Sequence, residues 1–190
     1  IIGPTGSGKT TFLDIFLGLL KPSSGEILFN NKPIFDEPII NLVDIGYLPQ
    51  DNFIINDTLV SNITLSYEKE EIDLKKIKNI VNKLDLDHFV NQLPKGINSV
   101  IGESGLKLSG GQRQKICLAR LLYHEKEILI LDEVTNALDK VAEENIIKIL
   151  KNLNKTIILI SHDHNNMRFC NRVYKIDKNK LQETDIKNFL

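Results

Sequence analysis

The chain has 190 residues, 42% of them hydrophobic and 26% charged, which suits one domain that buries a sizeable core. Its formal net charge of −1 argues against nucleic acid as the main partner. No apolar run reaches the roughly 18 residues of a membrane span, and no signal peptide is recognisable. The two cysteines, Cys117 and Cys170, form no C-x-x-C pair and are expected to be small buried residues, which fits a reducing cytosol.

The first ten residues, I-I-G-P-T-G-S-G-K-T, match the phosphate-binding P-loop pattern G-x-x-x-x-G-K-[ST]. Gly3, Gly6 and Gly8 let the backbone turn tightly, so that its N–H groups converge on phosphate oxygens. Lys9 supplies a positive charge for the β- and γ-phosphates, and the Thr10 hydroxyl can bind Mg²⁺. The pattern indicates a nucleoside triphosphate but not an enzyme class, because kinases and GTPases carry it too.

A P-loop follows a strand and opens a helix. Ile1–Ile2 are predicted to be the end of that strand, and because strands usually run about five or six residues, the N-terminal edge of the sheet is expected to be missing. The helix is predicted from apolar residues that recur on one face, with its N-terminus toward the phosphates. These residues are Phe12, Leu13, Phe16, Leu17 and Leu20.

The next segments predict short strands and then a helical region. Leu19–Gly25 is expected to be a loop and Glu26–Phe29 a short strand, followed by a turn at Asn30–Pro33. Ile45–Leu48 is expected to be a second strand, which ends at Pro49-Gln50-Asp51.

From there to about residue 107, apolar residues have helical spacing over Thr58–Leu65 and Ile72–Leu86. Leu93–Gly96 breaks this pattern and Val100–Gly105 is expected to be a loop. The segment therefore predicts a helical insertion in an α/β core. The expected inner face of the second helix consists of Leu74, Ile77, Val81 and Leu84.

Leu108–Gln112 reads L-S-G-G-Q, and Ser109 with Gln112 three residues later forms a capping-box pattern. The helix it opens is predicted to run to about Tyr123. Glycine in a helix's first turn costs roughly 1 kcal/mol relative to alanine, so two of them indicate a functional reason. Exposed N–H groups at a helix N-terminus form an anion site, and the alternative is an ordinary cap with glycines by chance.

Ile128–Leu131 is a continuous apolar run, which predicts a strand buried on both faces, and it ends at Asp132-Glu133. Carboxylates at the C-terminal end of a central parallel strand lie where such sheets bind ligands. Asp132 would hold Mg²⁺ through water, and Glu133 would orient or deprotonate an attacking water.

An amphipathic helix over Val141–Leu153 and a buried strand over Thr156–Ile160 follow. This strand ends at Ser161-His162, so His162 is expected at the same ligand edge, where it can bond a γ-phosphate. Arg172–Ile176 and Lys180–Glu183 are expected to close the chain as a hairpin. The order of elements predicts an α/β fold with a mostly parallel sheet and an inserted α-helical subdomain.

These motifs together resemble the nucleotide-binding domain of an ATP-binding cassette (ABC) protein. Gly3–Thr10 is similar to the family's Walker A, Gln50 to its Q-loop and Leu108–Gln112 to its signature. The later motifs that match are Walker B at Ile128–Asp132, the catalytic glutamate at Glu133, the D-loop at Ala137–Asp139 and the switch histidine at His162. The resemblance implies a P-loop NTPase of the RecA-like class, with its core at about 1–50 and 116–190 and its helical subdomain at about 51–115.

The resemblance also implies a set of site residues for ATP and Mg²⁺. Glu133, His162, Lys9 and Gln50 are expected to act in catalysis. Thr10, Gln50 and Asp132 are expected to hold Mg²⁺. The residues expected to bind nucleotide are Gly3, Pro4, Thr5, Gly6, Ser7, Gly8, Lys9, Thr10, Thr11, Ser109, Gly110, Gly111, Gln112 and Asp132.

Finer similarities point to the exporter branch of the family, among them Tyr47–Asp51, Leu93–Gly96 and Val100–Gly105. Such a protein would pair with a second cassette, as a homodimer or heterodimer, in which Ser109 and Gly111 contact the partner's ATP. It would dock on the coupling helices of a transmembrane domain at the cytoplasmic face of the membrane, with no nucleic acid partner.

Three positions depart from the family's pattern. Asn136 stands where serine is usual, Asp163 where many exporters have arginine, and Asn30-Asn31 where Asp-Gly is common. Two other functions stay open from the sequence: a soluble ABC ATPase that acts on the ribosome or DNA, and a nucleotide sensor that does not hydrolyse. The absence of sustained heptads between the P-loop and the signature weighs against the first, and intact Glu133 and His162 against the second.

Overall fold

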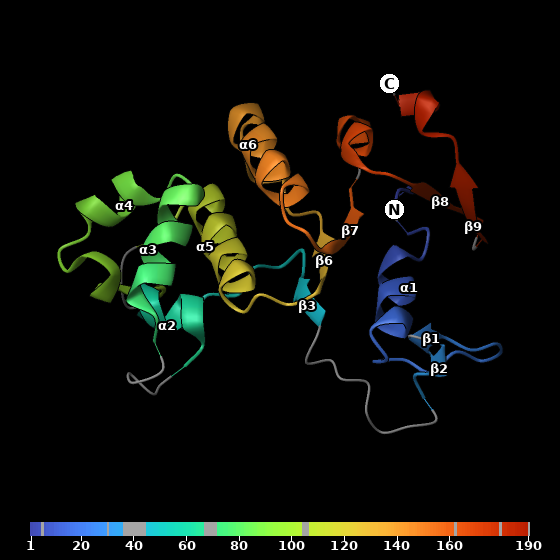
Figure 1. The fold of residues 1–190 in the computed structure, drawn as a ribbon, viewed down its shortest axis with the longest axis horizontal. Helices are drawn as coiled ribbons and strands as arrows, with labels where there is room; N and C mark the ends of the chain where they lie inside the picture. The colour runs from blue at the N-terminus through green and yellow to red at the C-terminus, as the bar shows by residue number, and fades with distance from the viewer. Residues whose placement is uncertain are drawn as a thin grey trace.

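The computed structural model describes residues 1–4, 6–29, 31–35, 45–66, 72–103, 107–161, 163–178 and 180–189. The predictions for Thr5, Asn30, His162 and the 104–105 part of the predicted loop fall outside these residues. Figure 1 shows a central sheet with α1 (Lys9–Phe16) and α6 (Lys140–Lys151) on different sides of it, and a group of helices beyond β3.

The central sheet is parallel, in the order β3 (Ile45–Leu48), β6 (Ile128–Asp132) and β7 (Thr156–Ile160), and all three strands lie where the sequence predicted them. Ile1 continues the sheet beside β7, because Ser161 N donates to Ile1 O at 3.3 Å. Ile2 pairs on its other side with Lys175 of β8 (Val173–Asp177). The residues that enter the P-loop therefore lie between β7 and β8.

Strand β6 is buried on both faces, as its continuous apolar run predicted. Leu129 and Leu131 belong to the large core cluster that includes residues of α6 and α5 (Gly110–Tyr123). Ile130 points to the opposite face, where it packs with Leu13 and Leu17 below α1. This alternation, with period two, encloses the strand between two helical layers.

Helix α1 ends at Phe16, just before the loop predicted at Leu19–Gly25. Gly18 follows with a φ of +74°, and the N–H groups of Leu19 and Leu20 both donate to Asp14 O. This is the left-handed glycine that commonly ends helices. Leu20 is 47% exposed as a result, so its prediction as part of the apolar face was wrong.

The predicted helical segment folds as α2 (Leu59–Thr64), α3 (Leu74–Lys83) and α4 (Asp87–Gln92), and α2 and α3 pack on α5. The predicted second helix ends early, since Asp85 has a φ of +52° and turns the chain into α4, which the periodicity did not reveal. Leu74 is 56% exposed, so its expected place on the inner face was wrong.

Two short strand pairs replace predicted turns and loops. β1 (Leu28–Phe29) pairs antiparallel with β2 (Lys32–Pro33), which the sequence had assigned to a turn. β4 (Asp57–Thr58) pairs antiparallel with β5 (Val100–Ile101), part of a predicted loop. The second pairing joins residues far apart in the chain, so local patterns could not reveal it.

The C-terminal hairpin is confirmed, with β8 paired antiparallel to β9 (Lys180–Thr184). Three 3-10 helices of the described residues were not predicted: Gly96–Asn98, His164–Phe169 and Ile186–Phe189. Within the described part of the chain, no helix has both the length and the apolar character needed to cross a membrane.

Candidate functional site

The P-loop forms a turn whose backbone depends on glycine. Gly8 caps α1 with a φ of +94° and Gly6 has a φ of +76°, both in the left-handed region that side chains rarely adopt. A Cβ at Gly3 would lie 2.7 Å from Ile176 O, so glycine is also required there for close packing on β8. The N-cap residue is a glycine and gives α1 no side-chain cap, and the first N–H groups of a helix have no partner within the helix itself.

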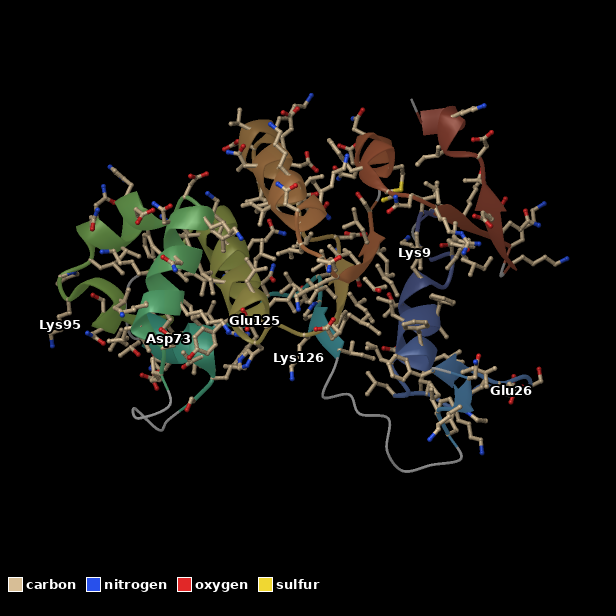
Figure 2. The ribbon with its side chains drawn as sticks, viewed as in Figure 1. Lys9, Glu26, Asp73, Lys95, Glu125 and Lys126 are labelled. Atoms are coloured by element: carbon tan, nitrogen blue, oxygen red, sulfur yellow. The ribbon has the colours of Figure 1, made fainter. Side chains whose placement is uncertain are left out.

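Lys9 lies over this turn and is only 8% exposed. Its Nζ donates to Gly3 O at 2.8 Å and to Pro4 O at 3.0 Å, and Figure 2 shows it at the start of α1. The Ser7 hydroxyl is buried, and no residue that the structure describes forms a hydrogen bond with it. A buried hydroxyl, a lysine and uncapped N–H groups at one helix N-terminus fit phosphate oxygens, because each of these groups can donate to an anion.

Asp132 and Glu133 lie at the C-terminal edge of the sheet, as predicted. Asp132 is the last residue of β6 and is 8% exposed, while Glu133 is 6% exposed. Glu133 has a φ of +53°, rare for a residue with a side chain, and its N–H donates to Ile160 O at 2.9 Å. Such a backbone is strained and persists only where the surrounding structure imposes it, which is typical of functional sites.

The Glu133 carboxylate accepts two side-chain amide hydrogen bonds on the same oxygen. Gln50 Nε2 donates to Oε2 at 2.8 Å and Asn136 Nδ2 donates to it at 2.6 Å. Gln50 follows β3, the neighbour of β6, so the sheet brings these two predicted site residues together. Sequence reasoning named Asn136 only as a departure from the family pattern and missed this contact.

Asp132 places negative charge near the phenol of Tyr47. Burial raises the pKa of the Tyr47 phenol above its usual value of 10.0, and the charges of Asp132 and Asp14 raise it further. Tyr47 therefore stays neutral beside Asp132. A site that holds carboxylates of this kind suits a hard divalent cation such as Mg²⁺.

The signature helix begins with the capping box that the sequence predicted. Ser109 Oγ accepts from Gln112 N at 3.1 Å, and Gln112 Oε1 accepts from Ser109 N at 2.9 Å. A Cβ at Gly110 or Gly111 would lie 3.3 Å from the Cβ or the backbone oxygen of Ala137. The two glycines are thus used for close packing on the loop after β6, while Ser109 and Gly110 are exposed.

A polar cluster that the sequence did not reveal lies beyond β7. The amide of Asn166, 2% exposed, donates to Glu143 Oε1 at 2.8 Å and to Thr135 Oγ1 and Ser161 Oγ at 3.3 Å each. Ser161 Oγ also accepts from Asp163 N at 3.0 Å. These bonds join α6, the loop after β6 and the residues on either side of position 162.

A hollow of about 750 Å³ lies away from these groups, with walls from α1, α6, β7 and β8. The residues that line it are apolar for the most part and include none of the predicted site residues. The chemistry-bearing groups are instead grouped at the carboxyl ends of the strands and at the N-terminus of α1.

The profile of a family described as ABC transporter matches residues 1–136, well over half of the chain. This chain belongs to the ABC transporter family. Its fold is the ABC ATPase domain fold, an α/β P-loop NTPase, because it superposes on a solved structure entitled "Structure of a bacterial Atm1-family ABC exporter with ATP bound" with a TM-score of 0.89. That match has 28% identity and covers 98% of this ABC domain and 33% of the exporter chain.

Curated relatives agree. The ABC domain is 34% identical to "ABC transporter B family member 29, chloroplastic" from Arabidopsis thaliana, over 100% of the chain and 30% of the relative. It is 35% identical to the ATP-dependent lipid A-core flippase of Cupriavidus pinatubonensis, over 96% of the chain and 32% of the relative. The chain thus spans about a third of the relatives it matches, and these relatives give no support to a role on the ribosome or DNA.

Proposed function

We propose that this chain is the ATP-hydrolysing motor domain of an ABC exporter, and that it pairs with a second cassette around ATP to drive transport. One observation carries the proposal. The buried Glu133 carboxylate, oriented by Gln50, lies at the same carboxyl edge of the sheet at which Ile2 leads into the P-loop and Lys9. A water-activating group and a phosphate-binding group belong together only where a phosphoryl group is attacked.

The phosphates would lie on the N–H groups of the P-loop, from Gly6 to Thr11. Lys9 would exchange the carbonyls of Gly3 and Pro4 for the β- and γ-phosphate oxygens, with little change in its position. Ser7 would gain the partner that its buried hydroxyl lacks. Thr5, in the same loop, is expected to contribute its N–H group.

The residues that would hold Mg²⁺ are Thr10, Gln50 and Asp132, the last through water. When bound, the ion would neutralise charge on the phosphate oxygens. Gln50 can serve two groups at once, because its Nε2 donates to Glu133 while its amide oxygen is the atom that a cation would take. Gln50 would thereby link occupancy of the site to the orientation of Glu133.

Hydrolysis would be an in-line attack of water on the γ-phosphoryl group. Glu133 would orient or deprotonate that water, and His162 would bond the γ-phosphate from the end of β7. Lys9 and the partner's signature residues Ser109 and Gly111 would stabilise the developing charge.

The signature residues would act on the partner's nucleotide. Ser109 and Gly110 are exposed at the N-terminus of α5, where an anion is favoured, and Gly111 and Gln112 complete that turn. Two cassettes, identical or different, would then enclose two ATP molecules between one copy's P-loop and the other's signature.

The membrane partner would dock on the segment after Gln50 and on Val100–Gly105. Phe53 is 68% exposed and Val100 is 46% exposed, so both offer apolar surface to coupling helices. The domain would then work at the cytoplasmic face of the membrane, with a core at about 1–50 and 116–190 that moves relative to a helical subdomain at about 51–115.

The variant Glu133→Gln tests this function. It keeps the shape of the side chain but removes the base, so turnover should fall to background while ATP-driven dimers persist in size-exclusion chromatography. The unsubstituted protein should release phosphate from ATP. A sensor that binds ATP without hydrolysis would release none. Wild-type turnover by Glu133→Gln would contradict the role of Glu133.

A further inference from the structure

Asn136 stands in the turn after β6, three residues beyond Glu133. Its N–H donates to Glu133 O at 3.3 Å, and this turn folds the Asn136 side chain back onto the Glu133 carboxylate. Asn136 Nδ2 then lies 2.6 Å from Glu133 Oε2. Asn136 is exposed while the Glu133 that it contacts is 6% exposed, and a hydrogen bond to an ionised carboxylate is roughly twice as strong as one between neutral groups.

The contact matters because a glutamate carboxylate rotates easily about its last bond, where the torsional preference is broad. The orientation of Glu133 is therefore decided by its hydrogen-bond donors. Two amides approach the same oxygen from different elements, Gln50 from the end of β3 and Asn136 from the turn after β6. Among the described residues, these two amides hold Glu133 Oε2 from two sides.

We infer that Asn136 is a positioning residue for Glu133, and that its amide sets the rate of ATP hydrolysis by holding the carboxylate toward the attacking water. This inference rests on the proposed function. A serine hydroxyl ends one bond earlier than the asparagine amide, about 1.3 Å, so it would not reach Glu133 Oε2 from the same turn.

Asn136 also joins Glu133 to the signature helix. Ala137, the next residue, lies against the first turn of α5, where a Cβ at Gly110 or Gly111 would be only 3.3 Å from it. A movement of the α5 N-terminus would therefore displace Ala137 and, through the backbone, Asn136. The amide thus makes the orientation of Glu133 depend on the position of the signature in the same chain.

Three substitutions in the full-length protein test this role through the kcat and KM for ATP. Asn136→Ala removes the donor and should lower kcat about tenfold, because a hydrogen bond to a charged group contributes that much or more. Asn136→Ser should lie between alanine and the wild type. Asn136→Asp keeps the shape but repels Glu133, so its kcat should be the lowest, while KM and ATP-driven dimerisation stay within about twofold in all three.

The order of the kcat values of these three variants shows whether Asn136 positions Glu133 or only fills space. If Asn136 only fills space, the isosteric Asn136→Asp should behave like the wild type. Asn152→Ala is the matched control, an exposed asparagine at the end of α6, and it should leave kcat unchanged.

Glu133→Gln distinguishes this inference from the proposed function. Wild-type turnover by Glu133→Gln would overturn the proposed function itself. If Glu133→Gln is inactive, the Asn136 inference is overturned by wild-type kcat in Asn136→Ala, by an Asn136→Asp variant at least as fast as Asn136→Ala, or by a loss confined to KM.

Discussion

Helices α1 and α5 both have glycine at their N-terminal ends, and they use it differently. At α1, Gly8 is the cap itself, in a left-handed conformation, and a Cβ there would meet no atom within 4 Å. At α5, Ser109 is the cap, and Gly110 and Gly111 lie close to Ala137, so a Cβ at either would be tight at 3.3 Å. The first glycine is favoured by backbone conformation, and the other two by close packing.

The difference extends to hydrogen bonding. The N-cap residue Gly8 gives α1 no side-chain cap, so the N–H groups of its first turn can donate hydrogen bonds to a ligand. The first turn of α5 is satisfied within the chain by the Ser109–Gln112 capping box and is exposed. The α1 end is thus built to hold an anion alone, while the α5 end is stable by itself and can approach an anion that is held elsewhere.

The largest effect is expected at the α1 end. Lys9→Ala removes the one buried cation of the P-loop, so ATP hydrolysis should fall at least about a hundredfold, the scale for losing a group that stabilises transition-state charge. Phosphate release measures this. A loss of less than tenfold would mean that the phosphates do not lie where Lys9 now bonds Gly3 and Pro4.

The substitutions Gly8→Ala and Gly111→Val should show that the N-terminus of α1 binds ATP and that the N-terminus of α5 acts in the dimer. Gly8→Ala strains a φ of +94° and should weaken ATP binding to the single domain. Gly111→Val pushes into Ala137 and should leave that binding intact while ATP-driven dimers and turnover fall about tenfold. Titration with a fluorescent ATP analogue measures ATP binding, and size-exclusion chromatography measures dimerisation. Equal loss of ATP binding in both variants would contradict the different roles of the two helix ends.

Ser109→Ala should cost about 1 kcal/mol of unfolding free energy, because it removes a capping box. Asp73→Ala is the matched control, since Asp73 caps α3 by accepting from the N–H groups of Lys75 and Lys76. Urea unfolding should show similar losses, and only Ser109→Ala should also slow ATP hydrolysis. The same ATPase loss in both variants would reduce Ser109 to a structural cap.

The smallest effect is expected at the other end of α5. Burial lowers the pKa of His124 below its usual 6.5, and the charge of Lys126 lowers it further. The unfolded chain therefore binds a proton at a higher pH than the folded one, and the free energy of unfolding should fall slightly as the pH drops from about 7.5 through 6.5. The urea unfolding midpoint should change less between pH 7.5 and pH 5.5 in His124→Asn than in the wild type. An equal change in both proteins would contradict this role of His124.

Much of the fold followed from local pattern. The apolar run of β6 and the Ser109–Gln112 pair each carry their signal within a few neighbouring residues, and both lie where predicted. The pairing of β4 with β5 did not follow, because Asp57 and Ile101 meet only through tertiary folding. The loop after α1 was expected from Leu19, but Leu20 was wrongly placed on the apolar face, because its spacing continued past the left-handed Gly18.

The site divides in the same way. The P-loop and the acidic pair could be named from sequence, because strand ends place them at one edge. The amide of Asn136 on Glu133 and the Asn166 cluster could not, because they depend on how a turn folds back and on contacts between α6 and the residues after β7. Spacing identifies which residues reach the edge of the sheet, and tertiary contacts decide how they are oriented.

The central claim is that the P-loop of one copy and the signature of another enclose the same ATP. Full-length Glu133→Gln protein carrying Ser7→Cys, mixed with Glu133→Gln protein carrying Ser109→Cys, tests this by disulfide cross-linking. Burial raises the pKa of the native thiols Cys117 and Cys170, so they should react slowly. We predict an inter-chain cross-link that needs both substitutions and increases with ATP. ATP bound to both proteins without any cross-link, or a cross-link indifferent to ATP, would contradict the claim.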